Sequence, residues 1–385
     1  MNIMGCRFTH LLATMAGYQK TGISLIEWDG NQLLPTSCAD DLGIYILLPK
    51  LATFFGLSIE QAISYFFYIL LIVPAAIGII GFCAVYKHIV QRFIAVFGVL
   101  LLTLFAKAVG DVYLCYSSSL LLILPFTVYF FENRKFDNLF LFFCLSIGFM
   151  VTTLQFIRSY SAIAPLIFFL ILMLLDIQLS IIRKLIFIGT CAVGMMMPLF
   201  YFNAVQNESL RYAIQNNLID TKQEKKHPLW HTLYVGFGLL HFKNEHQIAY
   251  DDSCAAKKVQ SIDNSIAYCS AEYDAILKNE VINLFKYHFL FVLLTLFAKL
   301  GVLFYFLLKF ANVGLIAALF YPKSWVIELG FFFALAFNSL FVFIAMPIHE
   351  YALGFIAAAA LYGIVSINHA LSKLKRVKLP LFIFR

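Results

Sequence analysis

The sequence predicts an all-α polytopic membrane protein. Of its 385 residues, 62% are hydrophobic and only 13% are charged, and the mean hydropathy is +0.85. Soluble domains are about 45–50% apolar and about 25% charged, so a soluble globular enzyme and a nucleic-acid-binding domain are excluded. The 42 Phe and 20 Tyr agree with this class, because aromatic side chains suit lipid contact and the membrane interface. We therefore expect the lipid bilayer as a partner and no nucleic acid.

Nine apolar segments have the length of a membrane span, which needs about 20 residues of helix. The expected spans are residues 62–86, 93–110, 115–131, 138–155, 161–180, 185–203, 300–320, 325–346 and 351–371. The chain then divides into four parts. They are an acidic loop with an interfacial helix (1–60), transmembrane helices (61–203), a large loop with an interfacial helix (204–299), and transmembrane helices with a basic tail (300–385).

Basic residues gather in alternate short loops and after the last span. They are Lys87, Arg92, Arg134, Lys135, Arg183, Lys184, Lys323, Lys373, Lys375, Arg376 and Lys378. Cytoplasmic loops of membrane proteins are rich in Lys and Arg. This pattern predicts that residues 1–60 and 204–299 are extracytoplasmic, and it makes the net charge of +7 chiefly a sign of topology.

The pair Asp40-Asp41 is the sharpest polar feature. Residues 44–55 follow it, and their mostly apolar composition predicts an interfacial helix along the membrane surface. One carboxylate at such a boundary can remove a proton from an attacking hydroxyl as a general base. The other can hold a metal ion or orient the first. The alternative is that both cap the following helix, where carboxylates are favoured.

Arg158 lies between two spans on the same side as the acidic pair. An arginine at the membrane is costly and tends to face a partner or a cavity, and its planar fork suits a phosphate. The alternative is that Arg158 snorkels to the interface. Lys107 and Asp111, at the preceding turn on this side, have the four-residue spacing of an ion pair.

The large loop contains the run His227-Pro228-Leu229-Trp230-His231. Two histidines four residues apart share a helical face, but the proline between them disfavours a zinc pair. Trp230, His231 and Tyr234 are instead expected to form a polar-aromatic surface that stacks on sugars or lies at the interface. His349, in the turn after the eighth span, adds an ionisable group on this side.

Two cysteines, Cys254 and Cys269, also lie in the large extracytoplasmic loop. A disulfide between them would close a loop worth about 3 kcal/mol in the chain-entropy model. Two free thiols are the equally open alternative.

Together these features resemble the GT-C superfamily of membrane glycosyltransferases. The resemblance lies in the topology and in the short runs Trp28-Asp29-Gly30, Asp40-Asp41-Leu42-Gly43, Ile157-Arg158-Ser159 and 227–231. It implies that a sugar moves, with inversion, from a polyprenyl-phosphate-linked donor to a hydroxyl of a glycan, lipid or protein acceptor. It also implies a bacterial inner-membrane protein with an extracytoplasmic active site.

The resemblance also implies roles for particular residues. Asp40 is expected to be the catalytic base, and Asp41 is expected to support it or to bind a divalent metal ion, the one cofactor suggested. The residues expected to bind substrate are Arg158, Trp230, His231 and His349. One departure is that such enzymes carry a transmembrane helix before the acidic loop, and residues 1–20 do not supply one.

Two other functions compete with the glycosyltransferase. A transporter or lipid flippase is the first, because charges on one face can line a vestibule. Transporters place polar groups near the bilayer midplane, and the expected spans contain few such groups. The second is a non-catalytic GT-C-like protein, which the missing first helix favours.

Overall fold

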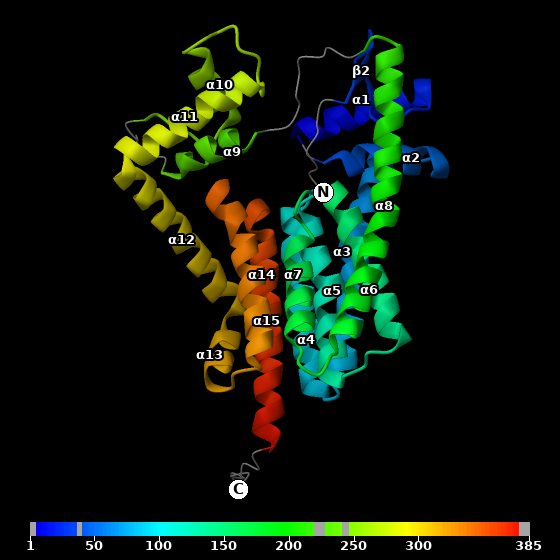
Figure 1. Cartoon of the computed structure of the whole chain (residues 1–385), viewed down its shortest axis with the longest axis vertical. Helices are drawn as coiled ribbons and strands as arrows, with labels where there is room; N and C mark the ends of the chain where they lie inside the picture. The colour runs from blue at the N-terminus through cyan, green and yellow to red at the C-terminus, as the bar shows by residue number, and fades with distance from the viewer. Residues whose placement is uncertain (1–4, 37–40, 219–227, 241–245, 377–385) are drawn as a thin grey trace.

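The computed structural model describes residues 5–36, 41–218, 228–240 and 246–376 (Figure 1). The first half of the chain contains α1 (Gly5–Thr21), α2 (Leu42–Phe55), α3 (Ile59–Val85), α4 (Ile89–Val109), α5 (Leu114–Asn133), α6 (Asn138–Ile157), α7 (Ile163–Leu175) and α8 (Ile181–Gln215). A short antiparallel hairpin of β1 (Ile26–Trp28) and β2 (Leu33–Pro35) lies between α1 and α2.

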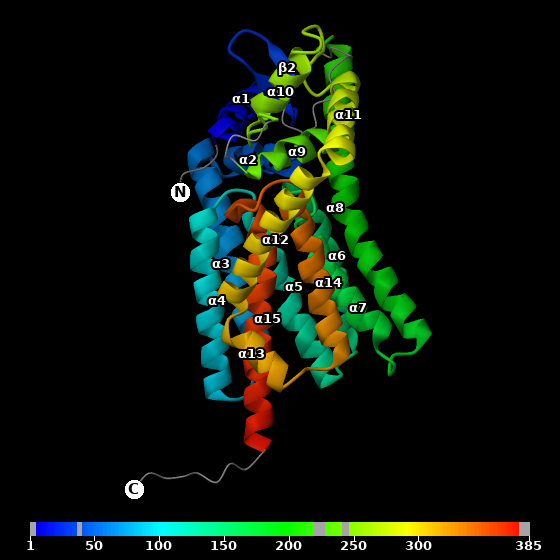
Figure 2. The same ribbon diagram turned by 90° about the vertical axis from the view of Figure 1, so that its left-hand side faces the viewer.

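The second half contains α9 (Leu229–Gly236), the 3₁₀ helix η1 (Phe237–Leu239), α10 (Asp252–Gln260), α11 (Ala271–Tyr287), α12 (Phe289–Ala311), α13 (Val313–Phe320), α14 (Trp325–Ile344) and α15 (His349–Arg376). Helices α9, α10 and α11 form a small unit with its own apolar core. This unit lies beyond one end of the long helices (Figures 1 and 2).

Among the described residues, eight helices are long and apolar enough to cross a membrane: α3, α4, α5, α6, α8, α12, α14 and α15. They run roughly along the long axis of the molecule (Figure 1). Their outer faces carry large exposed apolar side chains, such as Tyr65, Ile69 and Ile72 on α3. Apolar surface this extensive does not face water in a soluble monomer. The fold is therefore that of an all-α polytopic membrane protein, which confirms the predicted class.

The ninth expected span, residues 161–180, contains only the 13-residue helix α7. At 1.5 Å per residue α7 is about 20 Å long, short of the roughly 30 Å hydrocarbon core. It nevertheless connects the two ends of the bundle. Arg158, before it, pairs with Asp41, whereas Asp176, after it, pairs with Arg134 at the opposite end. Successive spans therefore still alternate in direction between the two ends of the bundle, as expected. The prediction of a full-length helix over residues 161–180 was wrong.

The expected span at residues 300–320 also needs correction. Helix α12 begins at Phe289, directly after the break at His288, and ends at Ala311. Asn312 then adopts a left-handed φ of 45°, which separates α12 from the short helix α13. The expected boundary at residue 299 therefore falls inside a membrane-length helix, because the apolar run from Phe289 belongs to the span and not to the loop.

The bundle has two chemically different ends. The basic end carries Lys87, Arg92, Arg134, Arg183 and Lys323, next to the ends of α3, α5 and α7 and the starts of α4, α8 and α14. The other end, here called the Asp41 end, carries α1, the hairpin, α2 and the α9–α11 unit (Figures 1 and 2). Helix α2 lies across the long helices there (Figure 1), as an interfacial helix would.

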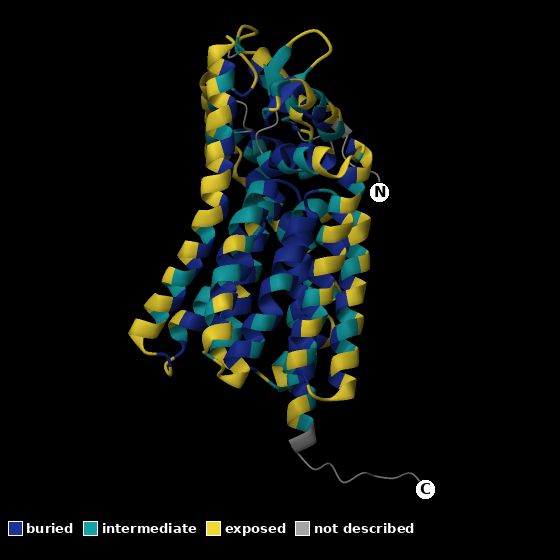
Figure 3. Cartoon of the chain, turned by 90° about the vertical axis from the view of Figure 1, so that its right-hand side faces the viewer, coloured by how far each residue is buried: buried dark blue, intermediate teal, exposed yellow. Residues whose placement is uncertain are grey.

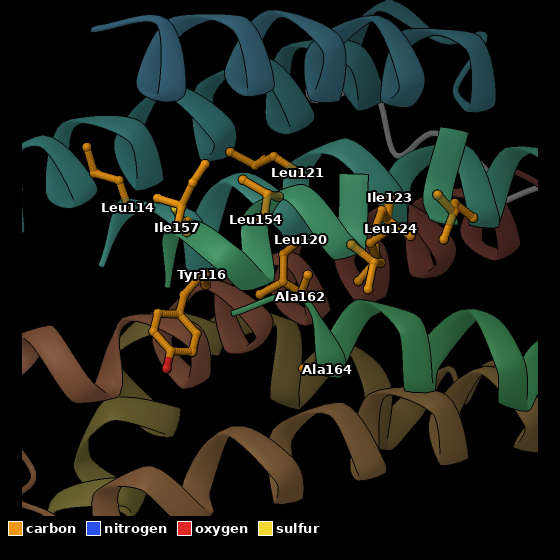
Figure 4. Packing of buried hydrophobic residues seen from close by; sticks show 14 of the residues in the cluster. Leu114, Tyr116, Leu120, Leu121, Ile123, Leu124, Leu154, Ile157, Ala162 and Ala164 are labelled. Atoms are coloured by element: carbon orange, nitrogen blue, oxygen red, sulfur yellow. The ribbon is translucent and has the colours of Figure 1, made fainter. Parts of the chain in front are cut away.

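Helix α5 is the centre of the bundle. Of its membrane-crossing window 83% is buried, against 28% for α8, and buried residues follow the middle of the bundle in Figure 3. Leu120, Leu121 and Leu124 of α5 meet Leu154 of α6 and Ala162 in a continuous apolar core (Figure 4). Helix α15 is the next most buried, at 72%. Side chains at the starts of α5 and α15 are therefore held by the most rigid part of the fold.

Helices α6 and α8 approach each other through glycines. A Cβ placed on Gly148 would overlap the carbonyl oxygen of Cys191, and one placed on Gly194 would overlap that of Leu145. Small residues allow this backbone contact between membrane helices, where packing and not water drives association.

We predict that Gly148→Ala lowers the free energy of unfolding by about 1–3 kcal/mol, because the added methyl group forces α6 and α8 apart. The measurement is thermal unfolding of the detergent-purified protein. Gly189→Ala on α8 is the matched control, since a Cβ there meets nothing within 4 Å. Equal melting temperatures for Gly148→Ala and Gly189→Ala would contradict the close contact.

Candidate functional site

Asp41 is the centre of a buried ionic cluster at the Asp41 end. Its carboxylate is 3% exposed and accepts hydrogen bonds from two arginines. Arg7 Nε donates to Oδ2 at 2.8 Å, and Arg158 Nη1 donates to Oδ1 at 3.0 Å. Asp41 precedes α2 but makes no side-chain capping bond to it. The capping alternative is therefore wrong for Asp41, because both oxygens serve the arginines.

Close backbone packing brings Asp41 to Arg158. A Cβ on Gly43 would lie 2.8 Å from the carbonyl group of Phe156 and from the amide nitrogen of Ile157. The first turn of α2 can therefore rest directly on the end of α6, which finishes at Ile157. Asp41, directly before α2, and Arg158, directly after α6, lie next to this contact.

Arg7 extends the cluster to the turn between α4 and α5. Its Nη1 donates to Asp111 Oδ2 at 2.8 Å. Burial raises the pKa of the Asp111 carboxyl above its ordinary value, and the Arg7 charge opposes that shift. The predicted pairing of Lys107 with Asp111 is wrong: Lys107 is exposed, and the carboxylate turns inward to Arg7.

Tyrosine rings cover the guanidinium groups. The Tyr113 ring centroid lies 4.7 Å from Arg158 Cζ and 5.9 Å from Arg7 Cζ, within the range of cation–π attraction. Tyr351, from the first turn of α15, meets the Tyr113 ring edge-on at 5.5 Å between centroids. Tyr250 lies beside Tyr351. Burial raises the pKa of Tyr250 to about 12, so this phenol stays protonated near neutral pH and can act as a hydrogen-bonding wall.

We call Arg7, Asp41, Asp111, Tyr113, Arg158 and Tyr351 the Asp41 cluster. Its two arginines and two aspartates balance in formal charge. Within the described residues, Arg158 Nε is buried and forms no hydrogen bond. An acceptor oxygen placed against Arg158 would gain a charge-assisted hydrogen bond there.

His231 lies outside this cluster, in the core of the α9–α11 unit. It is 2% exposed, with Nδ1 2.8 Å from Tyr273 Oη and Nε2 3.1 Å from Asp252 Oδ1. Tyr234 is also buried. The predicted polar-aromatic surface is therefore wrong for these two residues, which hold α9 against α10 and α11. Trp230 is partly exposed, with Lys278 Nζ 5.9 Å from its ring centroid.

The α9–α11 unit touches the bundle at the end of α14. A Cβ on Gly236 would overlap the carbonyl oxygens of Ile344 and Ala345. Lys299 of α12 donates from Nζ to the carbonyls of Phe343 and Ala345, both at 2.7 Å. The unit therefore packs on the end of α14, beside carbonyl groups that Lys299 engages.

The structure does not bring His349 to the Asp41 cluster. Its side chain is exposed, and its ring lies 5.4 Å from the Phe105 centroid and 5.5 Å from the Phe306 centroid. Tyr351, two residues later, reaches the cluster instead. Asp40, the expected base, lies outside the described residues.

The donors around Asp41 do not fit a divalent metal ion. Both carboxylate oxygens face guanidinium groups, whose charge repels a cation. Across residues 5–36, 41–218, 228–240 and 246–376, no group of three His, Cys, Asp or Glu side chains could hold a metal. Cys254 and Cys269 are not joined by a disulfide in this structure, so the loop between them is not closed.

No family model, curated protein or solved structure matches this chain. The Asp41 cluster is therefore the main evidence on its function.

Arg7 is the charged cluster residue that sequence reasoning missed. A signal was present, because Arg7 is the one Lys, Arg, Asp or Glu among the first 19 residues of the sequence. A lone charge in an otherwise weakly polar helix is costly unless it has a partner. Its two partners come from positions 34 and 104 residues away, which spacing does not reveal.

We predict that Asp41→Asn lowers the free energy of unfolding by about 3–5 kcal/mol, because it leaves two partly buried guanidinium groups without their shared counter-ion. Thermal unfolding in detergent measures the loss. Asp263→Asn is the matched control, since that side chain is exposed and bonds only to Ser265 in the following turn. An unchanged melting temperature for Asp41→Asn would show that the ion pairs do not hold this end together.

Proposed function

We propose that this chain is a membrane glycosyltransferase. It would move a sugar, with inversion, from a polyprenyl-phosphate-linked donor to an extracytoplasmic hydroxyl of a glycan, lipid or protein. The observation that carries the proposal is the Asp41–Arg158 ion pair. It joins the acidic loop to an arginine 117 residues away, at the end of the bundle opposite the basic loops.

In this proposal Arg158 binds the donor phosphate. The Nε group forms no hydrogen bond within the described residues, and the side chain is 13% exposed. Asp41 and Tyr113 hold the guanidinium in place from two sides. A guanidinium fixed in this way can donate to a phosphate oxygen without first losing much side-chain freedom.

The proposed reaction assigns the base to Asp40, the residue directly before Asp41. Its carboxylate takes the proton of the acceptor hydroxyl while the acceptor oxygen forms a bond to the anomeric carbon. The bond from that carbon to the phosphate oxygen breaks, and its electron pair stays on the polyprenyl phosphate. Arg158 then steadies the negative charge of the leaving group. Asp41 acts as a positioning residue, because its own oxygens are engaged.

The membrane geometry supports a lipid-linked donor. At the end of α2, Phe54 is 81% and Phe55 62% exposed. Exposed aromatic residues on a crosswise helix suit the bilayer interface. A polyprenyl chain lying in the bilayer would reach the Asp41 cluster from the side at this level. By the positive-inside rule the Asp41 end is extracytoplasmic, and we propose the bacterial inner membrane as its location.

We predict that Asp40→Asn abolishes sugar transfer but leaves the melting temperature unchanged. The assay uses the full chain in proteoliposomes with a panel of polyprenyl-phosphate hexoses and pentoses. Asp263→Asn is the control and keeps full activity. Transfer by Asp40→Asn at the wild-type rate would remove Asp40 as the base. Lipid translocation by the wild type without transfer to any acceptor would favour a flippase instead.

We predict that Arg158→Lys raises the KM for the lipid donor by about 10- to 100-fold and leaves the KM for the acceptor within twofold. The change keeps the charge but removes the planar fork, and a hydrogen bond to a charged group contributes about 1.5–3 kcal/mol. Arg183→Lys, exposed at the basic end, is the matched control. Equal increases for donor and acceptor would count against a phosphate-binding role.

A further inference from the structure

A second polar site lies at the basic end, far from the Asp41 cluster along the bundle. It is a cavity of about 430 Å³ where the ends of α3, α5 and α15 meet the start of α4. Its polar lining includes Tyr86, Lys87, Gln91, His369, Ser372 and Lys373. Small-molecule sites have volumes of about 300–1,000 Å³, so the cavity is large enough for a lipid head group or a small phosphate ester.

Gln91 fixes one wall of this cavity. Its side chain is 7% exposed, and its Nε2 donates to the Asn368 carbonyl at 2.8 Å and to Ser372 Oγ at 2.7 Å. Ser372 in turn donates to the same carbonyl at 3.0 Å. These bonds join α4 to α15 and hold the polar wall in one arrangement.

The deep part of the lining has unused hydrogen-bonding capacity. Tyr86 is 6% exposed; its hydroxyl lies near the side-chain amide of Asn368 but forms no hydrogen bond of good geometry within the described residues. Within those residues, His369 Nε2 and both side-chain amide atoms of the adjacent residue Asn368 likewise form none. Buried polar atoms without partners cost about 1–3 kcal/mol each, and native proteins rarely leave several together. A polar ligand would satisfy Tyr86 and His369 directly.

The rim of the cavity is cationic. Lys87 and Lys373 line it with exposed side chains, and neither forms an ion pair within the part of the chain described above. Glu132 lines the same cavity and offers an acceptor for a hydroxyl group. Two free ammonium groups above buried hydrogen-bonding groups match a phosphate ester whose polar substituent points inward.

We propose that this cavity binds a phosphate ester, with the phosphate between Lys87 and Lys373 and its hydroxyl-bearing substituent against Tyr86, His369 and Glu132. Basic pockets between membrane helices on the cytoplasmic side suit anionic head groups. The ligand is either such a lipid or a soluble phosphate ester from the same side. The site is separate from the proposed glycosyltransferase chemistry and does not depend on it.

The test measures ligand binding to the full detergent-purified chain by native mass spectrometry. The probes are phosphatidylglycerol, diacylglycerol with the same acyl chains, and glycerol 3-phosphate. We expect at least tenfold tighter binding of phosphatidylglycerol than of diacylglycerol. Displacement of the lipid by millimolar glycerol 3-phosphate would support the site and identify a soluble ligand as sufficient.

The variant Lys87→Ala/Lys373→Ala is expected to weaken binding at least tenfold. The matched control is Lys135→Ala/Arg183→Ala, which removes the same charge from the same end outside the cavity and is expected to bind within twofold of wild type. Tyr86→Phe, which keeps the ring, is expected to weaken binding several-fold. The proposal is overturned if both double variants bind alike, or if neither phosphate-bearing probe binds better than diacylglycerol.

Discussion

The carboxylate of Asp41, held between Arg7 and Arg158, is the interaction on which the Asp41 end of the molecule depends. Taking charged groups out of water is costly, and the cost is offset only when each charge meets an opposite charge with good hydrogen-bond geometry. The cluster meets this condition with two arginines and two aspartates. Removing any one of them would leave a buried charge uncompensated. Helix α1, the start of α2, the turn before α5 and the end of α6 are thereby joined at one point.

The bundle supplies the rigidity that such a cluster needs. Helices α5 and α15 are the most buried of the membrane-length helices, and Tyr113 and Tyr351 stand at or next to their first turns. Gly43 allows α2 to rest on the end of α6, so the ion pair is set by backbone contact and not by long flexible side chains alone. The same principle of close approach through glycine joins α6 to α8 within the membrane.

The two ends of the bundle differ in how their charges are used. At the Asp41 end, the arginines are paired and covered by tyrosines, and Arg158 keeps one buried donor. At the basic end, Lys87 and Lys373 stand at the rim of a polar cavity without ion-pair partners in the described chain. The Asp41 end and the basic end therefore present different chemical groups to whatever lies on the two sides of the membrane. A ligand at the Asp41 end would meet guanidinium groups already paired with carboxylates, whereas one at the basic end would meet ammonium groups without an ion-pair partner in the described chain.

The sequence by itself determined the membrane class, most of the spans and the separation of basic loops from the acidic pair. These properties depend on the hydrophobicity and charge of about 20 neighbouring residues at a time, so short stretches of sequence are enough to predict them. The same local reading placed Asp41 and Arg158 on one side but did not show that they touch. It also misjudged the start of α12 and the length of α7, because a helix begins or ends according to the backbone at single residues, such as His288 before α12 and Asp176 after α7.

Only the tertiary structure decided what the polar residues do. Asp41 accepts hydrogen bonds from two arginines and makes no side-chain capping bond to α2, and Asp111 pairs with Arg7 and not with Lys107. His231 is buried in the α9–α11 unit, and His349 lies outside the Asp41 cluster. The physical reason is that a side chain pairs with whatever partner packing brings within about 3 Å. The partners in the Asp41 cluster are 34 to 117 residues apart in the sequence, and a pattern of neighbouring residues does not reveal pairs so far apart.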